Sequence, residues 1–221
     1  MKLNYKKYNH LSFDLWLTLI RSNPEFKQKR NQLFKDFFEI NAPIKRITEV
    51  VRYYDVLCNN INEKTGLNLS TYEIYYLILG ALEVDLVSNG IEKLSEFYNE
   101  TEVLFFDNKP ELIFPNIKLQ FEEIVEEGKS INILSNTGFI KGKSLKKLLS
   151  YYELTDSISF QIYSDEVGFS KPNLEIFQLV FDQVRGLKKV EKNEILHIGD
   201  NSFADYNGAI NFGFDAHLLK N

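Results

Sequence analysis

Polar residues with side chains suited to phosphoryl transfer follow several apolar runs of the 221-residue sequence. Asp14 ends the first such run, and Thr18 follows it closely. A carboxylate can attack phosphorus and form an acyl-phosphate. Hydroxyl and free amide groups at a helix start can hold phosphate oxygens, and carboxylates are ligands for Mg²⁺. The groups that supply these functions are, in chain order, Asp14 with Thr18, Ser135-Asn136-Thr137, Lys171, and Asp200 with Asp205.

The elements that would position these residues alternate between strand and helix. Apolar runs predict strands at 11–15, 131–134, 158–162, 195–198 and 216–219, and helical patterns lie near 141–153, 172–185 and 203–212. This alternation predicts βαβ units on a parallel sheet. Active-site residues of such a fold lie just past the carboxyl ends of the strands, where the polar groups above are found.

Between about residues 22 and 110 the pattern is helical, with no convincing strand. Asn23 followed by Pro24 predicts a helix start, and a second helix is expected to end at Gly66. Ser70 and Glu73 form a capping-box pattern before the third helix, and apolar residues at 91–98 predict a fourth. Four amphipathic helices inserted after the first strand predict a small helical cap. We therefore expect a core at 1–21 and 110–221 and a cap at 22–109.

The four motifs FDLWLTL, ILSNTG, GFSKPNLEIF and HIGDNSFADYNGA resemble those of the haloacid dehalogenase-like (HAD) hydrolase superfamily in their order and kind of spacing. The resemblance covers roughly residues 9–22 and 110–221, and the helical insertion resembles the first cap class of the family. It implies an α/β hydrolase with a Rossmann-like parallel sheet core and a helical-bundle cap domain.

The resemblance also implies a nucleophile and a metal site. Asp14 would be the nucleophile and a ligand of Mg²⁺, with the backbone carbonyl of Trp16 as a second ligand. Asp200 would ligate the metal, and Asp205 or Asn201 would support it directly or through water.

Four further residues receive roles from the resemblance. Thr18 would hold the neighbourhood of the nucleophile in place. Ser135 and the backbone amide of Asn136 would bind the phosphoryl oxygens, and Lys171 would bridge the nucleophile and the phosphoryl group.

Trp16 departs from the phosphatases of the family, which usually carry a second aspartate two positions after the nucleophile. That aspartate protonates the leaving oxygen and then activates water, and such help is typically worth about 10²–10⁴-fold in rate. We therefore expect a Mg²⁺-dependent phosphatase that acts slowly on a small phosphorylated metabolite through an aspartyl-phosphate intermediate.

Two other functions stay open. Dehalogenases of the family carry an aromatic residue at the position of Trp16 and need no metal, and Arg21 or Arg30 could serve a halide site. The acidic pair Asp200 and Asp205 instead resembles the metal-dependent members. The chain could also be a catalytically weak protein that binds a phosphorylated ligand or a partner.

Composition narrows the class of protein. The formal net charge of −5 gives no general attraction to nucleic acid, and no apolar run approaches membrane-spanning length. The single cysteine, Cys58, and the lack of a signal-peptide pattern favour a cytoplasmic protein. We expect a small-molecule partner, such as a phosphate ester, with no nucleic acid and no membrane; the sequence leaves the oligomeric state open. His197 lies in a predicted buried strand and is interpreted as a core histidine with satisfied hydrogen bonds.

Overall fold

Five parallel strands form the central sheet of the computed structural model, which describes residues 4–86 and 89–219. The strand order is β5-β4-β1-β6-β7. The strands are β1 (His10–Phe13), β4 (Ser130–Ser135), β5 (Phe160–Tyr163), β6 (Ile195–Gly199) and β7 (Asp215–Leu218). The predicted α/β class with a parallel sheet is confirmed, and β1 lies at the centre of the sheet.

Two strand ends differ from the sequence prediction by two residues, and the other ends differ by one at most. β1 ends at Phe13 rather than at residue 15, because the carbonyl of Leu15 accepts hydrogen bonds from the amides of Leu19 and Ile20 and so closes a turn. β5 begins at Phe160 rather than at residue 158, because pairing with β4 starts where the Ser159 amide donates to the carbonyl of Ile131.

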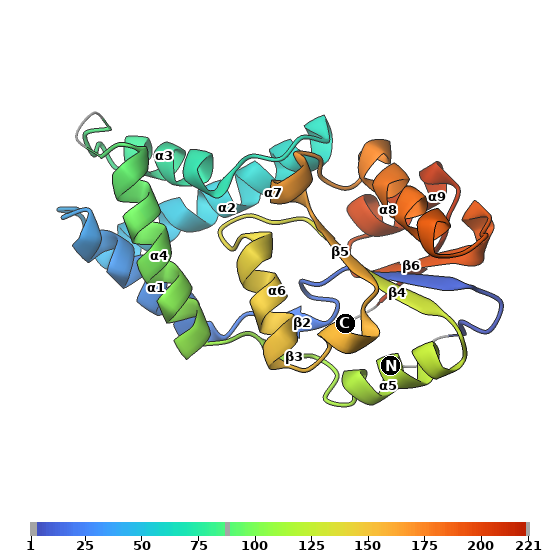
Figure 1. The fold of residues 1–221 in the computed structure, drawn as a ribbon. Helices are drawn as coiled ribbons and strands as arrows, with labels where there is room; N and C mark the ends of the chain where they lie inside the picture. The colour runs from blue at the N-terminus through green and yellow to red at the C-terminus, as the bar shows by residue number, and fades with distance from the viewer. Residues whose placement is uncertain (1–3, 87–88, 220–221) are drawn as a thin grey trace.

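Helices cover both faces of the sheet (Figure 1). On one face, α5 (Ile117–Glu126) and α6 (Gly142–Tyr151) contribute to an apolar cluster with Phe13 of β1. On the other face, α8 (Leu174–Leu187) and α9 (Gly208–Phe212) pack on the sheet through Phe177 and Phe212. No helix was expected at the position of α5. One helix was expected over 203–212, where the structure has a π-helical turn, η3 (Ser202–Asn207), followed by α9. Three further short helices are α7 (Ser164–Val167), η1 (Thr155–Ser157) and η2 (Lys192–Glu194).

Four helices form a separate group beside the sheet in Figure 1. They are α1 (Pro24–Phe37), α2 (Ile44–Thr65), α3 (Thr71–Ala81) and α4 (Ile91–Asp107). The predicted signals are present: Asn23 accepts a hydrogen bond from the Glu25 amide, Gly66 ends α2 in the left-handed region, and Ser70 with Glu73 forms a capping box. Aromatic residues of α1, α3 and α4 pack into one cluster, so this group has its own apolar core and forms the helical cap.

The cap contacts the core at several places, among them its entry strands and the end of α2. Where the chain enters and leaves the cap, β2 (Ile20–Arg21) and β3 (Glu111–Leu112) pair in antiparallel fashion, which the sequence did not reveal. Near the end of α2, the Gly66 carbonyl accepts hydrogen bonds from the Ser170 amide and from Nδ2 of Asn173, both at 3.0 Å. The Asn68 amide donates to the carbonyl of Gly168 at 3.0 Å.

The division at residues 22 and 109 stays a prediction, and its parts at 1–3, 87–88 and 220–221 lie outside the described residues. None of the helices that the structure describes is long and apolar enough to cross a membrane.

Candidate active site

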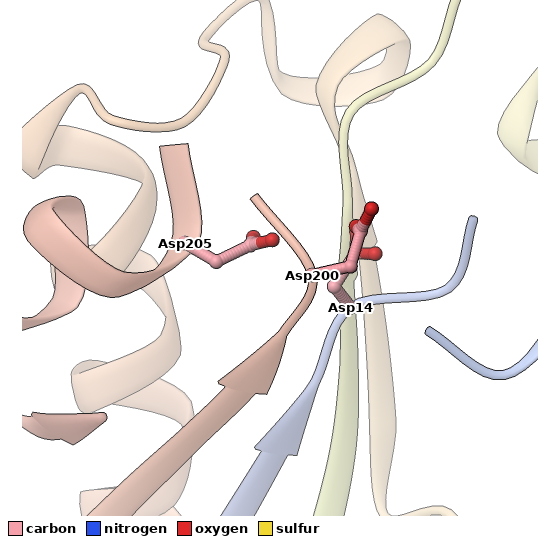
Figure 2. A group of neighbouring side chains, drawn as sticks. All are labelled: Asp14, Asp200 and Asp205. Atoms are coloured by element: carbon pink, nitrogen blue, oxygen red, sulfur yellow. The ribbon is translucent and has the colours of Figure 1, made fainter. Parts of the chain in front are cut away.

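Three aspartates converge at the carboxyl ends of the two central strands (Figure 2). Asp14 follows β1, and its amide donates to the carbonyl of Ile198, which fixes the backbone beside β6. Asp200 follows β6 directly, and Asp205 reaches toward both from η3. One carboxylate oxygen from each of the three lies within 4.8 Å of the others. The sheet therefore brings together three of the residues to which the sequence assigned metal-binding roles.

Gly199 allows Asp205 to come this close. A Cβ atom added to Gly199 would lie only 2.6 Å from Cβ of Asp205, a distance that real Cβ atoms do not tolerate. The backbone amide of Asn201 then donates to Oδ2 of Asp205 at 3.0 Å. The missing side chain at the end of β6 thus leaves the space that the Asp205 carboxylate occupies.

Lys171 lies between two of these carboxylates and is only 1% exposed. Its Nζ is 2.7 Å from Oδ1 of Asp14 and 2.7 Å from Oδ1 of Asp205. It also donates to the carbonyl of Leu134 at 2.7 Å. The ammonium group has three donors, so these three contacts use its full hydrogen-bonding capacity. A phosphoryl group could bind to Lys171 only by taking the place of one of them.

Burial and neighbouring charge change the acidity of the site. Burial, opposed by Lys171 and assisted by Asp205, raises the pKa of Asp14 to about 6. Burial and the Asp205 charge also raise the pKa of Asp200. Burial would raise the pKa of Asp205 as well, but Lys171 and His197 outweigh it and hold that pKa below its usual range. Burial disfavours charged Lys171, yet the two carboxylates raise its pKa. The site therefore contains a charged lysine and more negative charge than that lysine can balance.

His197 is fully buried in β6, and both its ring nitrogens have partners. One lies 3.0 Å from Oγ of Ser12, and the other lies 3.2 Å from Oδ1 of Asp205. Burial lowers its pKa. The interpretation of His197 as a satisfied core histidine is confirmed, and the structure adds that it orients Asp205.

The loop after β4 supplies the Asn136 side chain, which is locked to the lysine segment. Asn136 Oδ1 accepts from the Lys171 amide at 2.8 Å, and its Nδ2 donates to the Lys171 carbonyl at 3.0 Å. Ser135 is fully buried, and its hydroxyl donates to the carbonyl of Asn136 at 3.1 Å. Thr18 is also fully buried, and its hydroxyl has no hydrogen-bond partner among the described residues. The roles of Ser135 and Thr18 stay predictions.

A cavity of about 310 Å³ lies over these groups, between the core and the cap. Asp14, Trp16, Asn136, Lys171, Asp200, Asn201 and Asp205 line its core side, whereas Ser135 and Thr18 are absent from the described lining. Trp16 is half-buried, and the residue after it, Leu17, has a left-handed φ of 58°. Since Leu17 has a branched side chain, this turn is a strained part of the loop beside the nucleophile.

The cap side of the cavity was not anticipated from the sequence, except for Arg30, which was named as a candidate for a halide site. It includes Lys27 and Arg30 of α1 and Asp55, Asn59 and Glu63 of α2. Glu63 accepts a hydrogen bond from Nδ2 of Asn201 at 2.8 Å and so joins cap to core. The four-residue spacing of the α2 residues was the available signal, because it places them on one helix face. By contrast, Arg21 is exposed and pairs with Glu111, so it does not lie on the described cavity wall.

This geometry defines the class of the protein, which is an α/β enzyme with clustered carboxylates at its strand ends and a helical cap. The family model of haloacid dehalogenase-like hydrolases matches residues 12–218. The chain belongs to this family and is a hydrolase.

Similar proteins span most of the chain. A glyceraldehyde 3-phosphate phosphatase of Methanothermobacter thermautotrophicus is 24% identical over 202 residues, which cover 83% of this chain and 84% of the relative. The magnesium-bound HAD-hydrolase YfnB of Bacillus subtilis superimposes with a TM-score of 0.71 at 18% identity and covers 97% and 89% of the two chains. The L-2-haloacid dehalogenase of Xanthobacter autotrophicus gives a TM-score of 0.61 at 21% identity, with 96% and 77% covered. At these identities the two structures establish a shared fold alone.

Proposed function

We propose that this hydrolase is a Mg²⁺-dependent phosphatase of small phosphate esters. The observation that carries the proposal is the group of three aspartates, Asp14, Asp200 and Asp205, on the floor of a cavity, with their oxygens within 4.8 Å of one another. The phosphatase relative from Methanothermobacter thermautotrophicus supports it.

The donor set fits a hard divalent cation. All three side chains offer oxygen ligands, which Mg²⁺ prefers, and the lysine beside them balances only part of their charge. Asp200 is in none of the ion pairs of residues 4–86 and 89–219, and burial together with the Asp205 charge raises its pKa. Asp14 and Asp200 would hold the ion, with Asp205 and the Trp16 carbonyl as further ligands. When bound, the ion would neutralise negative charge on the phosphate.

The reaction would begin at Asp14. One of its carboxylate oxygens attacks phosphorus, an acyl-phosphate bond forms, and the bond between phosphorus and the ester oxygen breaks. The departing oxygen takes a proton from solvent. Water then hydrolyses the acyl-phosphate, which releases phosphate and restores the Asp14 carboxylate. Lys171 would stabilise the charge on the transferring group once a phosphoryl oxygen replaces one of its present partners.

Trp16 would set the rate of this reaction. Trp16 lines the cavity, and its indole ring cannot supply the proton that a carboxyl group would bring to the leaving oxygen. The loss of such general acid–base help is typically worth about 10²–10⁴-fold. We therefore expect slow turnover that depends strongly on the leaving group.

A dehalogenase is the second candidate, because Trp16 is an aromatic residue on the cavity wall two positions after Asp14. The crowding of Asp200 and Asp205 against Asp14 weighs against it, since an attack on carbon needs no such concentration of negative charge.

The test measures phosphate release from p-nitrophenyl phosphate and from aliphatic phosphate esters, with Mg²⁺ and with a chelator. Chloride release from 2-chloropropionate is measured in parallel. The Asp14→Asn variant is the matched control, since it preserves the shape of the side chain and removes the nucleophilic oxygen. We expect phosphate release that requires both Mg²⁺ and Asp14.

Chloride release without metal would replace this function with dehalogenation. Tight binding of phosphate mimics without release of either product would instead make the protein a phospho-ligand binder. Retention of most activity in Asp14→Asn would overturn the mechanism for any substrate.

A further inference from the structure

Arg30 is a buried cation on the cap wall of the cavity. It lies on α1, is 6% exposed and lines the same cavity as Asp14. Buried charges in proteins are normally paired, because an isolated charge away from water is costly. Yet Arg30 appears in none of the ion pairs of the described chain.

The two carboxylates on the cap side of the described cavity wall have other partners. Asp55 accepts from Nη1 of Arg52 at 3.0 Å, and Glu63 accepts from Asn201. Neither forms an ion pair with the guanidinium, so Arg30 has no paired carboxylate on the described cavity wall.

The guanidinium is held in a fixed orientation. Its Nε and Nη2 donate to Oδ1 of Asn31, at 3.3 and 3.0 Å, and Nδ2 of Asn31 donates to Oγ1 of Thr48 on α2. On its flat face, the guanidinium carbon lies 4.3 Å from the centre of the Phe139 ring. One edge of the group is therefore occupied, while Nη1 makes no described hydrogen bond. Such restraint reduces the conformational entropy that the Arg30 side chain would lose when a ligand binds.

Phe139 connects this cation to the phosphate end of the site. It belongs to the loop that also contains Asn136, and both residues line the cavity. An anion bound to Arg30 would thus share the cavity with a phosphate at Asp14. Because guanidinium N–H groups match both carboxylate and phosphate oxygens, the chemistry of the ligand is that of an oxyanion.

We propose that Arg30 binds a second oxyanion of the substrate, so that the preferred phosphate esters carry a carboxylate or a second phosphate away from the reacting group. This inference rests on the proposed function for the position of the first phosphate. It makes Arg30 a residue that determines specificity rather than one that takes part in the reaction.

The test uses calorimetry on the full-length Asp14→Asn variant with Mg²⁺, so that binding is measured without turnover. The probes are 3-(phosphonooxy)propanoate, its uncharged amide, and propane-1,3-diol bisphosphate. We expect the acid to bind about 10- to 100-fold more tightly than the amide, the range for a hydrogen bond to a charged group. Comparison of the acid with the bisphosphate shows which oxyanion the site prefers.

Adding Arg30→Gln should remove the preference for the acid over the amide, and Arg30→Lys should keep part of it. Arg46→Gln is the matched control, because Arg46 lies exposed on α2 outside this cavity and its replacement removes the same charge. Melting temperatures are measured for all variants, and the Arg30→Lys result decides the question if Arg30→Gln does not fold.

Equal weakening of acid and amide by the Arg30 variants would overturn the proposal, because Arg30 would then contact the shared phosphate. Equal binding of acid and amide to Asp14→Asn, or no binding of any probe, would also overturn it. Phosphate release by the wild type is a separate measurement. If the wild type releases no phosphate but its binding selectivity depends on Arg30, the phosphatase function is rejected and the oxyanion site is retained.

Discussion

Replacing Lys171 with methionine should destabilise the protein more than replacing any exposed lysine with methionine. Methionine keeps much of the length of the side chain but leaves the buried carboxylates of Asp14 and Asp205 without the ammonium 2.7 Å from each. Breaking a buried ion pair by removing one partner typically costs about 3–5 kcal/mol. With a urea dependence of about 2 kcal/mol per M, the unfolding midpoint should fall by roughly 2 M.

The loss of stability caused by Lys171→Met should be smaller at acidic pH. Lys171 lowers the pKa of Asp14, so its removal moves that pKa further above about 6. A folded-state pKa above the unfolded value means that the folded protein binds more protons between the two values. The free energy of unfolding of Lys171→Met therefore falls as pH rises through this range, and the variant should be closest to the wild type near pH 5.

Urea unfolding at pH 5 and pH 7, without added metal, measures both effects. Lys118→Met is the matched control, since Lys118 pairs with Glu153 on the exposed surface and should unfold close to the wild-type midpoint. A Lys171→Met protein within about 1 kcal/mol of the wild type at pH 7, below the range for a broken buried pair, would refute the reasoning. So would a loss that is the same at both pH values.

Three further outcomes are expected. Burial raises the pKa of Asp14 to about 6, so Mg²⁺ binding should release protons near pH 6 and almost none at pH 8, as calorimetry in buffers of different ionisation enthalpy would detect. Trp16→Asp should narrow the preference for aryl over alkyl phosphates, and an unchanged preference in a folded variant would show that position 16 does not govern proton transfer. Gly199→Ala should displace Asp205 and lower both melting temperature and Mg²⁺ affinity, whereas Gly186→Ala, with open space around it, should not.

Local signals in the sequence predicted the cap well. The hydrogen bonds that begin α1 and α3 involve residues two or three positions apart, so Asn23, Ser70 and Glu73 carry the information themselves. Gly66 ends α2 in a conformation that glycine adopts without strain. The two-residue strands β2 and β3 gave no such signal, because their pairing joins residues about 90 positions apart.

The site was only partly predictable for the same reason. Parallel strands end at one edge of the sheet, so the order of the motifs placed Asp14 and Asp200 near each other. The sequence could not show that Lys171 donates all its hydrogen bonds to Asp14, Asp205 and Leu134, since these contacts depend on side-chain positions in the folded chain. It also could not select Glu63, whose place on the cavity wall follows from how the cap packs on the core.

The hydrogen bonds between the end of α2 and the segment before α8 have a consequence for how the molecule melts. A cap and a core joined only by flexible linkers can unfold in separate steps. Here the Gly66 carbonyl and the Asn68 amide connect the cap directly to residues 168–173 by hydrogen bonds. That segment contains Lys171, whose contacts reach β4 and the aspartates. Loosening of the cap would therefore disturb the centre of the sheet. Heat should unfold the cap and the core in a single cooperative transition, with calorimetric and van't Hoff enthalpies that agree.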